Sequence, residues 1–230
     1  MRIFLAGATG ATGLVFEPMA TKAGHSLLLH VRPQSKAKSP IANDSRARVF
    51  DLNDANALDD AIRGCDAVVS LIGTMQKRFA AGDTYASSDV ATTRTLVEAA
   101  TRAGVKQFAL LSSVGAGGPG SYLKMKGECE SFVTNSSLRW ILARPSMLVS
   151  PPWAPASHHG TRDPSGALNA FFGITAVLPG LHRWTEKTKP IGIDVVCAAM
   201  IDALERDAHQ TILEGESLWA SAKRAKQLAP

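Results

Sequence analysis

A tyrosine and a lysine four residues apart, preceded by paired serines, are the strongest candidates for proton chemistry in this chain. Tyr122 and Lys126 stand at i and i+4 in YLKMK, so a helix would carry both on one face. A nearby ammonium favours the phenolate and lowers the pKa of a tyrosine, which is ordinarily about 10. We therefore expect Tyr122 to exchange a proton with a substrate oxygen, with Lys126 as its electrostatic partner. Ser113, or else Ser112, would orient the substrate carbonyl.

Glycines near the start of the chain indicate a second kind of site. LAGATGATGL at residues 5–14 follows an apolar run and has a glycine at every third position. Between a strand and a helix, such glycines allow a tight turn, approach of a pyrophosphate to the backbone, and close helix packing. The spacing is G-x-x-G-x-x-G, not G-x-G-x-x-G, but its position predicts a dinucleotide-binding loop. The expected contacts come from Gly7, Thr9, Gly10, Ala11, Thr12 and Gly13.

The end of the second apolar run predicts which dinucleotide binds. An NAD site usually has an acidic residue there, which holds the ribose 2′-hydroxyl. This chain instead reads HVRPQSK at residues 30–36, without a carboxylate. Arg32 is placed to meet a 2′-phosphate, with Ser35 and Lys36 as further donors. The alternative is a surface loop with two ordinary bases. We expect NADP(H) to be preferred over NAD(H).

Residues that follow other expected strands would complete the cofactor site. Ligands of open α/β sheets bind outside the carboxyl ends of the strands. Lys126 would also hold the nicotinamide ribose. The other expected contacts are Asp51 and Leu52 beside the adenine, Leu71, Ile72 and Gly73 along the middle of the cofactor, and Pro145, Ser146 and Met147 near the nicotinamide.

Short apolar runs that alternate with helical patterns must position these residues. Such alternation predicts βαβ units and a parallel sheet, and continuous apolar strands fit a sheet covered on both faces. The fold class is therefore α/β: a Rossmann-type doubly wound parallel sheet, strand order 3-2-1-4-5-6 plus a short extra strand, with helices on both faces. Strands are expected at 2–8, 26–31, 48–52, 66–72, 107–113, 138–143 and 211–214. Helices are expected up to about residue 23 and at 54–64, 87–103, 122–134 and 193–204.

Length and composition are those of one ordinary globular domain. The 230 residues are expected to form a single NAD(P)-binding domain over 1–230, with a substrate-side region at about 149–190. The net charge of +5 is scattered, so we expect no nucleic-acid partner. The three cysteines, Cys65, Cys129 and Cys197, show no metal-binding spacing and indicate reduced thiols without a metal site. Without a signal peptide or a membrane-length apolar run, a cytoplasmic location and no membrane partner are expected.

Taken together, the glycine loop, the serines and the Y-x-x-x-K pair resemble the short-chain dehydrogenase/reductase superfamily. YLKMKGECE at 122–130 resembles the Y-L-x-x-K-G-E-x-E signature of an atypical branch, the Tat-interacting-protein-type oxidoreductases. LLSSVGA at 110–116 and ARPSMLV at 143–149 are similar to segments of that branch. The resemblance implies an NADP(H)-binding fold and an oxidoreductase. Within the signature, Glu128 and Glu130 are expected to face solvent or to pair with lysines.

Three departures separate this chain from conventional members of the superfamily. The spacing from Ser113 to Tyr122 is shorter than the usual dozen residues. The fourth expected strand ends in Leu-Ile-Gly-Thr, without the asparagine of the conventional tetrad. Ser146 stands where the branch has glycine after Arg-Pro. These differences affect the substrate side and the proton relay, not the cofactor loop.

Three functions are compatible with these motifs. The first is NADP(H)-dependent reduction of a small carbonyl, quinone or related acceptor, with Ser113, Tyr122 and Lys126 as catalytic residues. The second is a regulator or sensor that binds NADP(H) with little or no turnover and has a protein partner. The third is a flavin or quinone reductase in which Tyr122 is a bystander and the dinucleotide does the chemistry.

Overall fold

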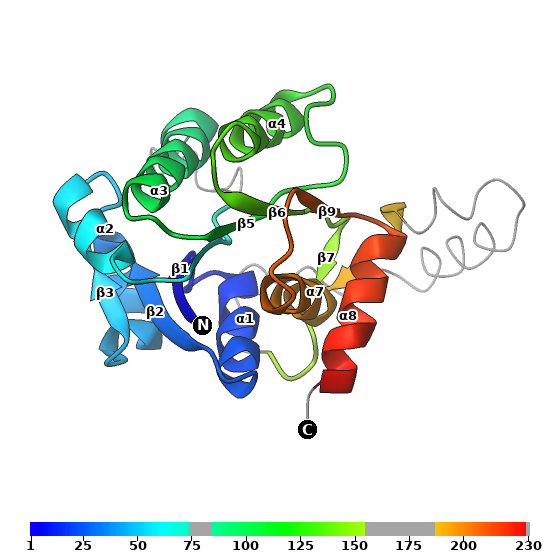
Figure 1. The fold of residues 1–230 in the computed structure, drawn as a ribbon, viewed down its shortest axis with the longest axis horizontal. Helices are drawn as coiled ribbons and strands as arrows, with labels where there is room; N and C mark the ends of the chain where they lie inside the picture. Colours follow the sequence, from blue (N-terminus) through cyan, green and yellow to red (C-terminus); the bar gives the residue numbers. More distant parts are fainter. Residues whose placement is uncertain (74–83, 155–186, 229–230) are drawn as a thin grey trace, which may run out of the picture.

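A parallel sheet of seven strands forms the centre of the computed structural model, which describes residues 1–73, 84–154 and 187–228 (Figure 1). The strand order β3-β2-β1-β4-β5-β6-β9 confirms the expected order, and the short extra strand lies beside β6. The strands are β1 (Arg2–Ala6), β2 (Ser26–Val31), β3 (Ala47–Val49), β4 (Ala67–Ser70), β5 (Gln107–Leu111), β6 (Arg139–Ala143) and β9 (Thr211–Leu213).

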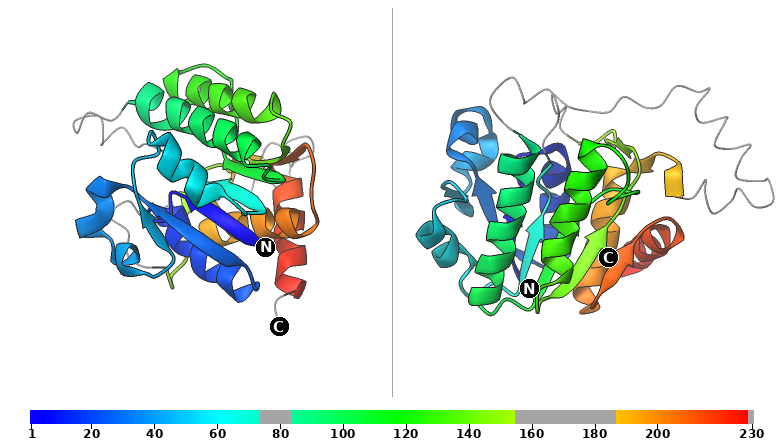
Figure 2. Two further views of the ribbon diagram at one scale, coloured as in Figure 1. Left: turned by 60° about the vertical axis from the view of Figure 1, so that its left-hand side comes forward. Right: turned by 90° about the horizontal axis from the view of Figure 1, so that it is seen from above.

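Helices cover both faces of this sheet, as a doubly wound fold requires (Figures 1 and 2). One face carries α1 (Ala11–Lys22), α7 (Ile193–Glu205) and α8 (Glu216–Leu228). The other carries α2 (Ala55–Ile62), α3 (Ala91–Arg102) and α4 (Ser121–Thr134). None of the helices within the described ranges is long and apolar enough to cross a membrane.

Alternation along each strand explains why two apolar cores form. Neighbouring side chains of a strand point to opposite faces. In β1, Ile3 and Leu5 therefore enter the core under α1 and α7, whereas Phe4 and Ala6 enter the core under α2, α3 and α4. Because both faces are buried, the strand is apolar from Ile3 to Ala6 and shows no polar alternation there.

Several elements differ from the sequence-based expectation. β1, β4 and β5 end two residues earlier than expected, because the chain leaves the sheet there to form the loops of the carboxyl edge. The helix expected over 87–103 is a π-helix, η4 (Tyr85–Val90), followed by α3. The pair β7 (Leu148–Val149) and β8 (Ile191–Gly192), the helix α8, and two 3-10 helices, η1 (Pro33–Lys38) and η2 (Pro40–Asn43), were not predicted. Most of the expected substrate-side region, 149–190, lies outside the described residues.

Candidate functional site

Two glycines of the first loop occupy positions that no other residue fits. Gly7 has a φ of +89°, and a Cβ there would lie 2.9 Å from the carbonyl carbon of Leu71. A Cβ on Gly13 would lie 2.2 Å from the carbonyl oxygen of Gly7. The first glycine thus allows the turn against β4, and the last allows α1 to approach the loop closely.

The middle glycine and the start of α1 fit a phosphate group. Gly10 is exposed and extended, with a φ of −82°, and a Cβ there would meet only the carbonyl oxygen of Gly7, at 3.3 Å. Within the described chain no side chain caps α1, so the N–H groups of Ala11, Thr12 and Gly13 remain at the helix start. An open backbone at the positive end of a helix is suited to a pyrophosphate. Thr9 is half-buried beside it.

The residues expected near the adenine ribose follow β2 and β3. Arg32 comes directly after β2 and is half-buried, and Ser35 donates its backbone N–H to the Arg32 carbonyl at 2.8 Å. Lys36 is exposed on η1. Since β2 pairs in parallel with β1, these residues share the sheet edge with the glycine loop. After β3, Asp51 is exposed and Leu52 is buried.

The segment after β4 connects the glycine loop to the catalytic candidates. Leu71 donates its N–H to the Ala6 carbonyl at 2.9 Å and contacts Gly7. Two residues on, a Cβ on Gly73 would lie 3.9 Å from Lys126 Nζ. Leu71, the half-buried Ile72 and the exposed Gly73 therefore lie between the proposed phosphate site and α4.

The structure brings Ser113, Tyr122 and Lys126 together. Lys126 Nζ donates to the Leu111 carbonyl at 3.1 Å and lies 6.0 Å from the centroid of the Tyr122 ring. Ser113 donates its hydroxyl to the Val114 carbonyl at 3.3 Å and lies near enough to Tyr122 to lower the pKa of the phenol. Its neighbour Ser112 is buried, and the hydroxyl has no partner within the described residues. Of the two serines, Ser113 is therefore the one beside the phenol.

The expectation that Lys126 lowers the pKa of Tyr122 is wrong. Tyr122 is 39% exposed, and the part of the ring that is buried raises the pKa above its ordinary value of 10; Ser113 opposes this, and the charge of Asp89 adds to it. Burial in turn lowers the pKa of Lys126, which the charges of Asp89, Cys129 and Glu130 oppose. In this state the phenol is protonated at neutral pH and suited to donate a proton.

Glycines in the loop before α4 explain how a short spacing still places Ser113 beside Tyr122. The N–H of Gly117 donates to the Leu123 carbonyl at 2.8 Å, so the loop folds back over the first turn of α4. A Cβ on Gly127 would lie 2.6 Å from the Gly117 Cα, so only glycine admits the loop at that distance. Close packing of the loop on α4 replaces the longer connection.

Glu130 and Arg144 form an ion pair that the sequence analysis missed. Arg144 Nε donates to Glu130 Oε1 at 2.8 Å, and its Nη2 donates to Oε2. The Glu130 side chain is buried, which corrects the expectation of solvent exposure or lysine pairing; Glu128 is exposed. The signal was present in the sequence: both residues belong to segments that resemble one branch of the superfamily.

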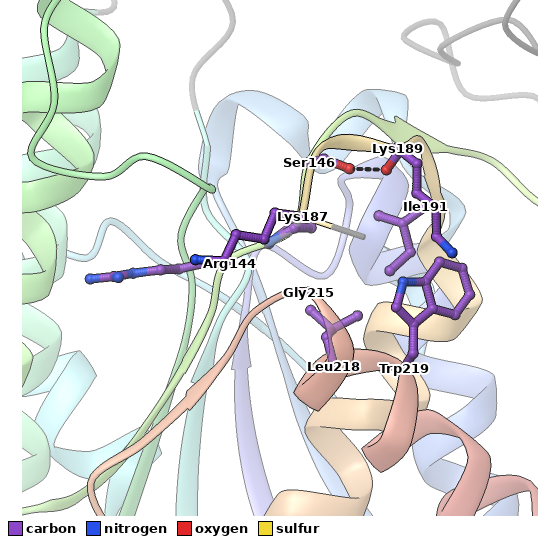
Figure 3. Close-up of a pocket in the computed structure, with 9 residues that line it drawn as sticks. Arg144, Ser146, Lys187, Lys189, Ile191, Gly215, Leu218 and Trp219 are labelled. Carbon is purple, nitrogen blue, oxygen red and sulfur yellow. Dashed lines mark hydrogen bonds between the residues drawn. The ribbon is translucent and has the colours of Figure 1, made fainter. Parts of the chain in front are cut away.

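The residues after β6 form one wall of a small pocket (Figure 3). The hydroxyl of Ser146 donates to the Lys189 carbonyl, which ties this loop to the segment before β8. Lys189 Nζ lies 4.5 Å above the Trp219 ring centroid. The pocket measures about 10 Å³, room for one water molecule. Pro145 is buried, and Met147 is 43% exposed.

In residues 1–73, 84–154 and 187–228, no group of three or more His, Cys, Asp or Glu side chains is arranged to hold a metal ion. The three cysteines are free and buried.

Comparison with known proteins decides the family. A family model described as NAD(P)H-binding matches residues 7–167, which include the glycine loop, Ser113 and the Tyr122–Lys126 pair. The chain belongs to this NAD(P)H-binding family. The match does not distinguish NAD from NADP.

Solved structures with low sequence identity share the fold of this NAD(P)H-binding protein. The oxidoreductase ylbE from Lactococcus lactis has a TM-score of 0.65 and 15% identity, and the match covers 100% of this chain and 99% of that chain. A short-chain dehydrogenase/reductase from Veillonella parvula has a TM-score of 0.60 and 18% identity, with 92% and 91% covered. WbmG from Bordetella bronchiseptica, crystallised with NAD, has a TM-score of 0.64 and 16% identity, with 99% and 77% covered. The chain therefore shares the Rossmann-type α/β fold of these three proteins.

Proposed function

We propose that this protein is an NADP(H)-dependent oxidoreductase of the atypical short-chain dehydrogenase/reductase type that reduces a small carbonyl, quinone or similar acceptor. The observation that carries the proposal is the convergence of Ser113, Tyr122 and Lys126 at the carboxyl edge of the sheet. Family membership supplies the dinucleotide. The whole chain would act as one domain, with the substrate held by residues of 149–190.

Residues from the glycine loop to β6 would hold the cofactor. The open backbone at Gly10 and the start of α1 would take the pyrophosphate. Arg32, at the end of β2, would meet the 2′-phosphate of NADP(H), a choice favoured by the absence of a carboxylate in residues 30–36. WbmG, which has a similar fold, was crystallised with NAD. The fold alone therefore does not select NADP(H), and in this proposal Arg32 makes that selection.

The chain's own residues would manage the proton. When bound, the reduced dinucleotide supplies a hydride to the acceptor. Ser113 would hold the acceptor oxygen, and Tyr122 would donate its proton to that oxygen. The Lys126 ammonium, fixed by the Leu111 carbonyl, would stabilise the resulting phenolate and hold the nicotinamide ribose.

The test is oxidation of NADPH against a panel of aldehydes, ketones, quinones and flavins. Tyr122→Phe is expected to lower kcat about 100-fold or more, since it removes the proton donor. Its dissociation constant for NADPH should stay unchanged. Tyr85→Phe is the matched control, because it removes the hydroxyl of a second tyrosine whose ring centroid lies 6.0 Å from that of Tyr122. Full activity of Tyr122→Phe, with weaker NADPH binding by Arg32→Ala, would instead support the flavin or quinone reductase.

A second candidate function follows from the departures of this chain from the conventional pattern, the short Ser113–Tyr122 spacing and Ser146 after Arg-Pro, both on the substrate side. A dinucleotide-binding regulator would need no acceptor site, and would bind NADPH tightly without turnover on the panel. Its protein partner would be captured in a manner that depends on the oxidation state of the cofactor. In either role, the buried free thiols suit a reducing compartment such as the cytoplasm.

A further inference from the structure

The helix η4 carries a tyrosine and a charged residue at the same spacing as α4, against which it packs. Tyr85 and Asp89 stand four residues apart on η4, as Tyr122 and Lys126 do on α4. The two tyrosine rings meet with their centroids 6.0 Å apart and their planes at 59°. Asp89 and Lys126 each follow their tyrosine by about one helical turn, and both are buried, with 2% and 4% of their surface exposed.

The buried ammonium of Lys126 needs a negative charge nearby. Burial of an unpaired charge is strongly unfavourable. The Leu111 carbonyl supplies one acceptor, but it is neutral. The carboxylate of Glu130, on the next turn of α4, is already held by two hydrogen bonds from Arg144. Among the groups that stabilise the charged form of Lys126, Asp89 acts most strongly, ahead of Cys129 and Glu130.

We propose that Asp89 is the buried counter-ion of Lys126 and thereby a positioning residue for the Tyr122–Lys126 pair. The inference deepens the proposed function and rests on it for its catalytic part. Asp89 would act on Lys126 through its charge, favouring the ammonium that the Leu111 carbonyl holds near the Tyr122 ring, in place for the ribose and for a developing phenolate. Before the reaction, its negative charge opposes ionisation of Tyr122 and so keeps the proton on the donor.

π-helical turns are rare and often occur at functional sites. Here the wider turn of η4 precedes the regular helix α3 and includes both Tyr85 and Asp89. The sequence contained a clue to this arrangement, since the spacing in YASSD repeats that in YLKMK. The contact between the two tyrosine rings brings these two pairs together.

Lysine NMR on the full chain tests the counter-ion directly. With 13C-labelled lysine, the Lys126 signal is assigned by its loss in Lys126→Met. In Asp89→Asn, Lys126 is expected to titrate at lower pH than in the unmodified protein, because the strongest nearby negative charge is gone. If Asp89→Asn only loosened the packing, water would reach Lys126 and its titration would move to higher pH. Opposite directions thus separate a counter-ion from a structural residue.

Glu128→Gln is the matched control for this experiment. Glu128 is an exposed carboxylate on the same helix and is not among the charges that act on Lys126. Its removal should leave the Lys126 titration in place. An equal downward shift in both variants, or no shift in Asp89→Asn, would overturn the inference.

Unfolding in urea gives a second test that does not depend on NMR or activity. Asp89→Asn removes the strongest negative charge that acts on the buried Lys126 and should lower the midpoint, and the added Lys126→Met change should restore at least half of the loss. Absence of any recovery would show that Asp89 stabilises the fold through other contacts.

Turnover separates this inference from the proposed function. If the protein is an oxidoreductase, Asp89→Asn should lower kcat about tenfold or more with little change in KM, as expected for a group that acts through the transition state. If the Lys126 titration and the urea midpoints change as expected but no acceptor is reduced, Asp89 is the counter-ion and the oxidoreductase proposal is wrong.

Discussion

Arg144 and Glu130 are joined by two hydrogen bonds that connect the end of β6 to α4. Arg144 Nε lies 2.8 Å from Glu130 Oε1, and the Arg144 backbone N–H donates to the Leu213 carbonyl of β9 at 2.8 Å. The pair therefore ties together the loop that carries Pro145 and Ser146 and the helix that carries Tyr122. The Glu130 side chain is 8% exposed, so the carboxylate depends on this partner.

Loss of that carboxylate is expected to destabilise the protein. Glu130→Gln leaves Arg144 partly buried without its anion and should lower the free energy of unfolding by about 2–4 kcal/mol. Urea unfolding measures the change. Asp60→Asn is the control, because its pair with Arg63 has side chains 72% and 76% exposed, and should change stability by less than about 1 kcal/mol. Equal effects of the two variants would contradict the structural role of Glu130.

The three glycines of the first loop should respond differently to alanine. Gly13→Ala places a Cβ 2.2 Å from the Gly7 carbonyl oxygen, so α1 must shift, and stability should fall by about 1–3 kcal/mol. Gly10→Ala has an ordinary φ of −82°, and its Cβ would displace only the Gly7 carbonyl oxygen, 3.3 Å away, by a few tenths of an ångström, so it should still fold but bind NADPH at least about tenfold more weakly. Calorimetry and thermal unfolding check both. Normal NADPH binding by Gly10→Ala would place the pyrophosphate elsewhere.

Arg32 should determine the choice of dinucleotide. Arg32→Ala is expected to weaken NADPH binding about 10–100-fold, because a charged hydrogen-bond donor to the 2′-phosphate is lost. NADH binding should change by less than about threefold, since NADH has no such phosphate. Lys38→Ala, at the far end of η1, is the control. Comparable losses for both dinucleotides on calorimetric titration would show that Arg32 acts on the fold of the loop.

The raised pKa of Tyr122 predicts the pH dependence of reduction. A proton donor acts in its protonated form, so the rate falls as pH rises through its pKa. Burial and the charge of Asp89 hold the pKa of Tyr122 above 10. Tyr122 should stay protonated between pH 7 and about 9, so its ionisation should not change kcat/KM for reduction in this range. We expect a decline only above about pH 10. A decline centred near neutral pH that persists in Tyr122→Phe would identify a different acid.

His30 should make stability depend on pH in the acid range. It is 3% exposed, its Nε2 donates to the Phe50 carbonyl at 3.0 Å, and burial lowers its pKa from 6.5 to about 4. As pH falls from 6.5 to 4, the unfolded chain binds a proton that the native protein excludes, so stability is lost. Between pH 7 and 4.5 the loss should be about 2 kcal/mol.

The variant His30→Gln isolates this contribution. Glutamine can still donate to the Phe50 carbonyl but does not titrate, so its stability should decline about 2 kcal/mol less than that of the unmodified protein over the same range. Urea unfolding at pH 7 and 4.5 provides the four values required. Parallel declines in the two proteins would show that other groups account for the acid sensitivity.

Local patterns determined most of the fold in advance. Buried parallel strands are apolar throughout, so β1, β2, β5 and β6 were found within two residues at each end. The carboxyl ends of the strands were predicted less well, because the apolar sequence continues past the last strand residue into the loop that follows. The sequence analysis missed the helix α8 and the pair β7–β8. Each strand of the pair has only two residues, which is too short for a recognisable pattern.

The sequence by itself determined the family's dinucleotide loop and the shared helix face of Tyr122 and Lys126, because both depend on spacing within a single turn or helix. Only the tertiary structure decided the electrostatics of the site. The charge of a group in the site depends on neighbours from other elements: Asp89 acts on Tyr122 and Lys126 from η4, and Arg144 binds Glu130 from the residue after β6. Because such pairings cross long stretches of chain, no local pattern contains them, and the pKa of Tyr122 moved opposite to the expectation from its own helix.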